Sequence, residues 1–387
     1  MEKESFVEIE TVEALVAHIE RVGDLRGVVV QGLDLRRADV AQALLGVSAA
    51  EAFFLGCRLT SPVEQHIRQS GGTIFPVFEG LPFNPYRPSL YTPEELMHGY
   101  ERGRRDSLAD TTDGRIYAYF AQHHRSDAPT PILVSLACRL HDHAIDDALL
   151  DLLYPADEPP RRVVGVMGGH RMQRDTEVYS TVARIAWRLA RQGYFVATGG
   201  GPGAMEAANL GAYMGAYAEA ELEAARTTLA TQPHYTDPLY FETAYDVRAA
   251  YPDGQPNLAL PTWFYGHEPT NLFSSYVAKY FANSLREDGL LAIARHGVIY
   301  APGSAGTIQE VFMDAAQNHY VTFGVVSPMV FLGTHYWTRE KPVYPLLTAL
   351  AAGRTYASML ALCDDVDEAL RFIVEHEPIV EKGDSNG

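Results

Sequence analysis

Three short apolar runs that end in glycine clusters constrain the fold of this chain more than any other feature of its sequence. They read VVGVMGG from Val163, YFVATGGG from Tyr194 and GVIYAPGSAG from Gly297. The second and third lead directly into segments with helical periodicity. Parallel strands need crossover connections, so repeated strand–helix units build a parallel sheet with helices on both faces. The sequence therefore predicts an α/β fold with a doubly wound parallel sheet, in which ligands bind at the carboxyl ends of the strands.

A proline-rich linker divides the chain. The stretch YPADEPPRR, from Tyr154 to Arg162, is charged and cannot continue a helix. We therefore expect an N-terminal accessory domain at residues 1–157 and a second domain at residues 158–387. The accessory domain alternates helix and strand signals before it becomes mostly helical, which predicts a smaller α/β domain.

Two segments of the second domain carry less regular patterns. Residues 219–268 are poorly periodic and rich in Tyr and Pro, which suggests a lid or an interface. From Asn271 onward, apolar residues spaced by four predict a helix. Such a helix would hold Lys279 in its middle, far from any cofactor signature, which argues against Schiff-base chemistry with pyridoxal phosphate. The residues spaced by four are Phe273, Val277, Phe281 and Leu285.

Composition and charge exclude several classes of protein. The 387 residues are 47% hydrophobic and 21% charged, as in an ordinary globular protein. No apolar run approaches the ~20 residues of a membrane helix, and the acidic N-terminus does not resemble a secretory signal. The net charge of −18 disfavours nucleic acid and anionic membranes as partners. Three widely separated cysteines match no metal spacing, so we expect a cytoplasmic protein without disulfides, metal or cofactor.

The glycine turns predict the kind of ligand. A glycine turn that opens a helix offers free N–H groups and a helix dipole to an anion, without Cβ atoms in the way. Such turns occur at Gly199–Gly203 and at Gly303–Thr307. One turn alone can serve packing only, whereas two in one sheet favour a phosphorylated ligand. Neither turn is followed directly by lysine, which excludes a P-loop, and GGHRMQRD after the first strand does not match the dinucleotide fingerprint.

The two turns also carry a family resemblance. TGGGPGAMEAAN and the later APGSAGTIQE resemble the paired motifs GGGxxGLMG and PGGxGTxxE of the LOG family, over roughly Val163 to His376. The larger bacterial members, nucleotide 5′-monophosphate nucleosidases with an added N-terminal domain, look most similar. The resemblance implies a Rossmann-like, homo-oligomeric hydrolase that cuts nucleoside 5′-monophosphates into free base and ribose 5-phosphate. The sequence departs from the motifs at Ser304 and Glu206, where the family usually has glycine.

Two residues are candidates for catalysis. Cleavage of an N-glycosidic bond passes through an oxocarbenium-like state, which a nearby carboxylate stabilises. Glu310 lies one turn into the helix behind the second glycine turn and matches the glutamate that closes PGGxGTxxE. The alternative is a capping box, with Thr307 as N-cap and Glu310 bonded back to the backbone. The family also has an arginine on the preceding helix, for which Arg286 is a better candidate than Arg295.

The predicted substrate-binding residues lie in the two glycine turns. The second turn would bind the phosphate through N–H groups and hydroxyls, and the first would form the opposite wall, with Glu206 near the ribose hydroxyls. The loop WFYGHEPTN places His267 and Glu268 beside aromatic rings able to stack on a base. The predicted binding residues are Gly200, Gly201, Gly203, Met205, Glu206, Gly303, Ser304, Gly306 and Thr307.

A different class of protein also fits the glycine turns. The same fold supports non-catalytic carriers of a nucleotide or cofactor, in proteins resembling molybdenum-cofactor carriers. A carrier or regulatory protein needs the phosphate turns but not Glu310. A role for Glu310 in bond cleavage therefore separates the two hypotheses.

Overall fold

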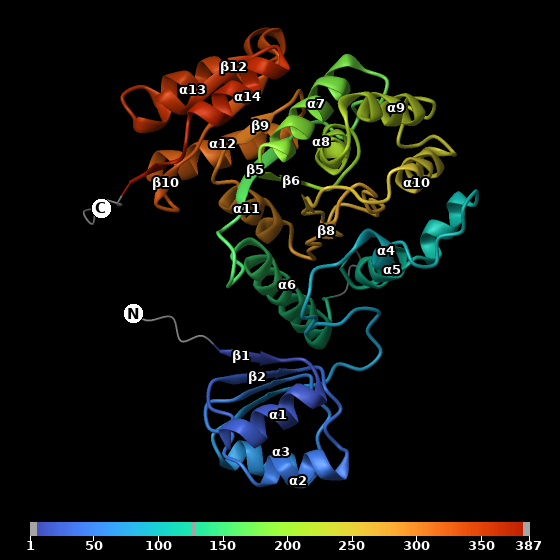
Figure 1. The fold of residues 1–387 in the computed structure, drawn as a ribbon, viewed down its shortest axis with the longest axis vertical. Coiled ribbons are helices and arrows are strands. Elements are labelled where there is room, and N and C mark those ends of the chain that lie inside the picture. The colour runs from blue at the N-terminus through green and yellow to red at the C-terminus, as the bar shows by residue number, and fades with distance from the viewer. Residues whose placement is uncertain (1–5, 125–128, 382–387) are drawn as a thin grey trace. The chain divides into compact units, whose positions relative to one another are not determined.

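A computed structural model describes residues 6–124 and 129–381, which form two compact units (Figure 1). One unit contains the residues up to Leu90 together with His123–Leu149. The other contains Tyr91–Gln122 and the residues from Leu150 onward. The linker led us to expect domains at residues 1–157 and 158–387. In the structure, the segment Tyr91–Gln122 of the first range belongs to the second unit.

The first unit contains a four-stranded parallel sheet with sequential strand order β1-β2-β3-β4. Three helices connect the strands, and α2 packs against both α1 and α3. Helix α1 begins behind Thr11, whose side chain accepts a hydrogen bond from Ala14 N, and Leu15 of this helix is fully buried. The elements are β1 (Val7–Ile9), α1 (Val12–Val22), β2 (Val28–Gln31), α2 (Ala38–Leu45), β3 (Phe53–Leu55), α3 (Ser61–Gln69) and β4 (Thr73–Phe75).

The second unit is built on a seven-stranded parallel sheet with the order β12-β11-β9-β5-β6-β7-β8. The predicted doubly wound sheet is therefore confirmed. A separate antiparallel pair joins β10 to β13. The strands are β5 (Arg162–Met167), β6 (Tyr194–Thr198), β7 (Leu258–Ala259), β8 (Tyr276–Val277), β9 (Val298–Tyr300), β10 (Val325–Val326), β11 (Met329–Leu332), β12 (Leu360–Cys363) and β13 (Ile379–Val380).

Helices cover both faces of this sheet. Val164 and Val166 of β5 belong to the core formed with α7, α8 and α14. On the opposite face, the Tyr300 hydroxyl donates to Asp314 of α12, 2.8 Å away. In helix α7, Thr176 caps the N-terminus and Val182 faces the core. The α-helices that follow the linker are α7 (Glu177–Arg191), α8 (Ala204–Tyr213), α9 (Glu219–Ala230), α10 (Tyr240–Ala250), α11 (Asn283–Ile293), α12 (Ala305–Tyr320), α13 (Val343–Ala351) and α14 (Val366–Glu375).

The remaining helical segments are short or lie before the linker. Helix α6 ends at Leu153, directly before the proline-rich linker. In the described ranges, no helix has the length and apolarity needed to cross a bilayer, and no three His, Cys, Asp or Glu side chains cluster as metal ligands would. These segments are α4 (Pro93–Leu96), η1 (Arg105–Asp110), α5 (Thr112–His124), α6 (Ile132–Leu153), η2 (Met214–Ala216), the π-helical η3 (Tyr336–Glu340) and η4 (Thr355–Met359).

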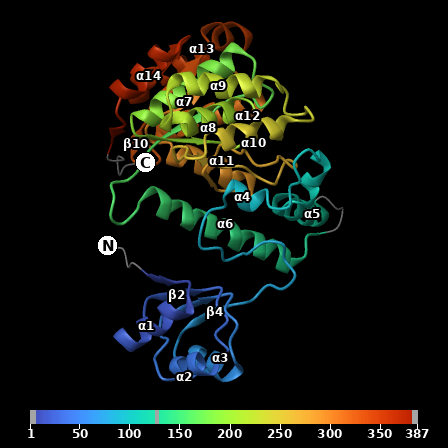
Figure 2. The ribbon, with the colours of Figure 1, turned by 45° about the vertical axis from the view of Figure 1, so that its right-hand side comes forward.

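Two local expectations need correction. The predicted helix from Asn271 to Leu285 is wrong: this segment forms β8 and extended backbone, and α11 begins only at Asn283. Residues 271–274 and 277–281 are all buried, the polar Ser274 and Lys279 included, so burial here follows no helical face and a spacing of four arises without a helix. The irregular segment 219–268 contains two regular helices, α9 and α10, which lie side by side (Figure 2).

Candidate functional site

Three turns meet at the point where the strand order of the large sheet reverses. From β5 the chain moves outward to β6, β7 and β8, and it returns to β9 on the other side of β5. The turn after β5 contacts the turns after β6 and β9: Gly169 N donates to Pro302 O at 3.0 Å, and Gly169 O accepts from Ala204 N at 3.2 Å. In open α/β sheets this switch point is where ligands bind.

A cavity of about 150 Å³ opens between these turns. Six of the residues predicted from the sequence line it, and so do residues from the turn after β5 and from the segment before α11. The predicted residues in the lining are Met205, Arg286, Ser304, Gly306, Thr307 and Glu310, and the others are Met167, Gly168, Gly169, His170, Gly199, Thr262, Tyr265 and Glu268.

The first turn of α12 is open toward this cavity. The helix begins at Ala305 with Ser304 as N-cap, and within the described part of the chain no side chain caps it. The first N–H groups of any helix lack an intrahelical acceptor, and here no described side chain takes its place. This is the arrangement that binds anions. The capping-box alternative is not realised, because Thr307 is the third residue of the helix and the Glu310 side chain bonds elsewhere.

Glu310 forms an ion pair with Arg286 at the cavity wall. Arg286 Nη1 lies 3.3 Å from Glu310 Oε1, and the two side chains are 11% and 13% exposed. Arg286 also contacts Glu287 at 3.3 Å and donates to Asn283 at 2.9 Å. Burial raises the pKa of Glu310 to about 7; Arg286 works against this rise, and Glu287 adds to it. Arg295, the other candidate, instead donates to Ala292 O.

Three of the predicted glycines serve packing rather than the cavity wall. A Cβ on Gly203, which has φ +73°, would lie 2.4 Å from Gly169 O. A Cβ on Gly200 would lie 3.0 Å from Ala259, and one on Gly303 would overlap Thr307. Gly200, Gly203 and Gly303 line neither of the two cavities described here.

Gly306 differs from these three glycines. A Cβ built on it meets none of the described atoms within 4 Å, and its φ lies outside the left-handed region. Its open side therefore belongs to the cavity at the start of α12.

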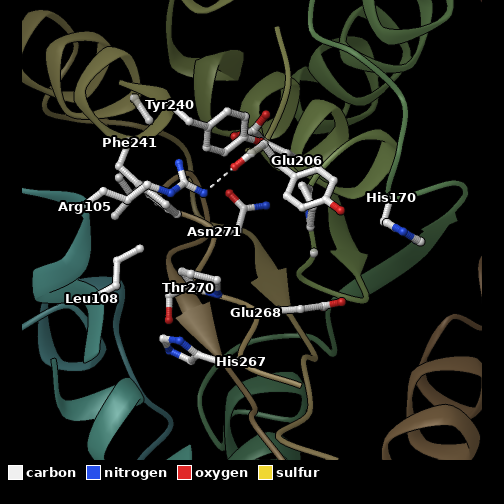
Figure 3. A pocket seen from close by; sticks show the side chains of 16 residues that line it. Arg105, Leu108, His170, Glu206, Tyr240, Phe241, His267, Glu268, Thr270 and Asn271 are labelled. Carbon is white, nitrogen blue, oxygen red and sulfur yellow. Dashed lines mark hydrogen bonds between the residues drawn. The ribbon is translucent and has the colours of Figure 1, made fainter. Parts of the chain in front are cut away.

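A second, larger cavity of about 410 Å³ shares His170 and Glu268 with the first. Figure 3 shows Tyr240, Phe241 and Arg105 on one side of it and Thr270 and His267 on another. The predicted residues Gly201 and Glu206 also line it. The complete lining is Arg105, Leu108, His170, Gly201, Pro202, Glu206, Tyr235, Tyr240, Phe241, Ala244, His267, Glu268, Pro269, Thr270, Asn271 and Leu272.

Glu206 is engaged by a buried arginine. Arg174, 1% exposed, donates to both carboxylate oxygens of Glu206 at 2.5 and 2.8 Å, and Tyr179 donates to the same carboxylate at 3.0 Å. Arg174 also stacks on Tyr240, 3.4 Å from the ring centroid. Glu206, which we expected near the ribose hydroxyls, is thus held in an ion pair within the protein. Arg174 could not be predicted from the sequence, because it lies 32 residues before Glu206 and no motif links the two.

A second buried ion pair supports the loop between the cavities. Lys279 Nζ lies 2.8 Å from Asp113 Oδ1, and both side chains are fully buried. Trp263 donates to Asp113 at 2.7 Å, and Lys279 donates to Glu268 O at 3.1 Å. Although burial works to raise it, Lys279 and His267 hold the pKa of Asp113 below its ordinary value. Asp113 lies far before the linker, so the sequence did not connect it with this site.

Known proteins resemble parts of this chain. The SLOG cluster4 family model matches residues 161–216, from β5 to η2, which include the first glycine turn. No curated protein sequence matches the chain. The nucleosidase activity expected from the LOG resemblance is therefore not established by these matches.

Solved structures of similar fold include two kinds of molybdenum cofactor protein. The molybdenum cofactor binding protein of Rippkaea orientalis is 12% identical, with a TM-score of 0.37, over 56% of this chain and 98% of that chain. The molybdenum cofactor carrier protein of Chlamydomonas reinhardtii is 17% identical, with a TM-score of 0.35, over 56% of this chain and 97% of that chain. At these scores the likeness says nothing of ligand or activity in this chain.

Proposed function

We propose that this chain is a cytoplasmic hydrolase that cleaves the N-glycosidic bond of nucleoside 5′-monophosphates. The observation that carries the proposal is the Arg286–Glu310 pair at the wall of a cavity that also contains the open first turn of α12. The anion site would hold the 5′-phosphate, and the carboxylate lies one helical turn further along the same helix. The distance from the proposed phosphate site to the Glu310 carboxylate therefore suits a ligand of the length of ribose 5-phosphate.

The phosphate would bind at the residues that open α12. The N–H groups of the first turn, together with the hydroxyls of Ser304 and Thr307, supply donors, and the helix dipole favours the negative charge. Gly306 leaves room for the phosphate because no Cβ stands in its way. Arg286 lines the same cavity, where Glu310 and Glu287 share its positive charge.

Glu310 would then act on the ribose. The bond between C1′ and the base nitrogen breaks, and its electron pair leaves with the base. A water oxygen bonds to C1′ and gives a proton to Glu310, while an equivalent proton from solvent reaches the departing base. Negative charge on Glu310 stabilises the positive ribosyl centre in between. A pKa of about 7 suits a group that takes up a proton near neutral pH.

A non-catalytic carrier is the second candidate. Glu310 is already held in an ion pair with Arg286, and such a pair can serve binding alone. A carrier would use the same two cavities and would release its ligand unchanged.

Release of ribose 5-phosphate from AMP, GMP, CMP, UMP and IMP tests the proposal. We expect release by the native protein and a loss of about 100-fold or more in Glu310→Gln, with nucleotide binding retained. The matched control is Glu340→Gln, which removes an exposed carboxylate of the same unit. Binding without release from any nucleotide would contradict the hydrolase and favour the carrier.

A further inference from the structure

The larger cavity has walls suited to a flat, uncharged group. Tyr235, Tyr240 and Phe241 contribute aromatic rings to the lining, and Leu108 and Ala244 contribute aliphatic surface. Aromatic rings bind planar groups by stacking and edge-to-face contacts. The volume of about 410 Å³ lies within the range of small-molecule sites, whereas the smaller cavity, at about 150 Å³, lies below it.

The charges around the larger cavity do not suit a phosphate. The carboxylates of Glu206 and Glu268 both line it, and Arg174 is committed to Glu206. Arg105 donates to the carbonyl oxygens of Tyr235 and Asp237. The smaller cavity also contains two carboxylates, Glu268 and Glu310, but it has the open first turn of α12 as well. An anion is therefore better placed there, and a neutral group fits the larger cavity.

One buried polar atom points to a ligand in this cavity. Thr270 is 2% exposed, and its Oγ1 has no hydrogen-bond partner within the described ranges. A buried hydroxyl without a partner costs about 1–3 kcal/mol, so a native site usually supplies one. Thr270 lines the larger cavity, where a ligand can complete its hydrogen bonding.

We propose that the larger cavity is the subsite for the heteroaromatic base of the ligand. This inference rests on the proposed function, in which the phosphate binds at the start of α12. Because the cavities share His170 and Glu268, one nucleotide can reach from one into the other. Thr270 bonds a ring nitrogen or carbonyl of the base, and Glu268 accepts from an N–H group.

A buried ion pair stabilises the loop that carries Glu268 and Thr270. Lys279 holds the backbone of Glu268 and is itself neutralised by Asp113. Trp263, which is fully buried, bonds to the same Asp113. The base subsite is thus preorganised, which lowers the entropy that binding must overcome.

Binding calorimetry with two ligands tests this subsite. Affinities for ribose 5-phosphate and for the five nucleoside monophosphates are measured on Glu310→Gln, which prevents turnover. We expect the best nucleotide to bind at least about tenfold more tightly than ribose 5-phosphate. Adding Ala244→Leu, which fills the larger cavity, should abolish that advantage and leave ribose 5-phosphate binding unchanged. Ala249→Leu, on the exposed side of the same helix, should preserve it.

Each other outcome has one meaning. Equal affinities for ribose 5-phosphate and every nucleotide, or an Ala244→Leu protein that keeps the nucleotide advantage, would overturn the base subsite while leaving the phosphate site intact. If none of these ligands binds, the proposed function itself fails. If Ala244→Leu proves unfolded by circular dichroism, Thr270→Val decides: an unchanged ratio of the two affinities overturns the subsite, and a ratio reduced severalfold supports it.

Discussion

At the scale of single residues, the chemistry of the site depends on one arginine shared by two carboxylates. Arg286 lies 3.3 Å from both Glu310 and Glu287, whose side chain is 8% exposed. One positive charge cannot fully compensate two buried negative charges. Burial raises the pKa of Glu310 to about 7, and the second negative charge, on Glu287, adds to this rise.

The first prediction concerns the pH dependence of activity. Glu310 acts as a carboxylate, so kcat/KM should rise as pH increases through about 7. Glu287→Gln removes a like charge and leaves Arg286 to Glu310, which lowers the pKa of Glu310. The rising limb of the pH–rate profile should then move to lower pH. Asp288→Asn, at an exposed neighbour, should leave the profile in place, and an unmoved limb in Glu287→Gln would contradict the shared arginine.

The second prediction concerns stability. The folded-state pKa values of Glu310 and Asp314, both about 7, lie above their ordinary values, so their contribution to stability is lost as pH rises from about 4 through 7. Glu310→Gln should therefore gain stability relative to the native protein between about pH 5 and pH 8, on the order of 2 kcal/mol. Chemical denaturation at both pH values measures the difference. An equal difference at the two pH values would refute the raised pKa.

At the scale of elements, glycines of the two turns play different parts. Gly203 allows the turns after β5 and β6 to touch, whereas Gly306 opens α12 toward the cavity. We expect Gly203→Ala to destabilise the fold, because its Cβ would lie 2.4 Å from Gly169 O. Gly306→Ala should fold normally and weaken phosphate binding about tenfold or more. Thermal unfolding and titration with ribose 5-phosphate compare the pair; unimpaired binding by Gly306→Ala would remove the phosphate from this turn.

Amphipathic helices and the short apolar strands that end in glycine clusters were predictable, and the longer buried run around β8 was not. Helices α1 and α7 have apolar residues at helical spacing, and in the structure these residues face the core. The run around β8 is buried at polar and apolar positions alike, so its apolar spacing could not distinguish strand from helix. Of the candidate site, the turn of α12 and Glu310 were visible in the motif. Arg174 and Asp113 were not, because their partners are distant in sequence and ion pairs of this kind carry no periodicity.

At the scale of the whole molecule, the second unit depends on a segment that precedes the linker. Asp113 neutralises Lys279, and Phe120 packs on Phe281 with ring centroids 5.3 Å apart. A fragment of residues 158–387 lacks both contacts. Leaving the buried charge of Lys279 without its partner costs about 3–5 kcal/mol. We therefore expect this fragment to be unstable, whereas a fragment of residues 91–387 should unfold cooperatively in urea; equal stability of the two fragments would contradict the prediction.

The most direct test of the central claim is product analysis in water enriched in ¹⁸O. The native protein is incubated with the nucleoside monophosphate that it binds best, and the masses of the products are measured by mass spectrometry. Hydrolysis at C1′ predicts ribose 5-phosphate with one ¹⁸O, together with unlabelled free base, and neither product in Glu310→Gln. Recovery of the intact nucleotide from a protein that binds it, or ¹⁸O in inorganic phosphate, would contradict the assignment of this site to N-glycosidic cleavage.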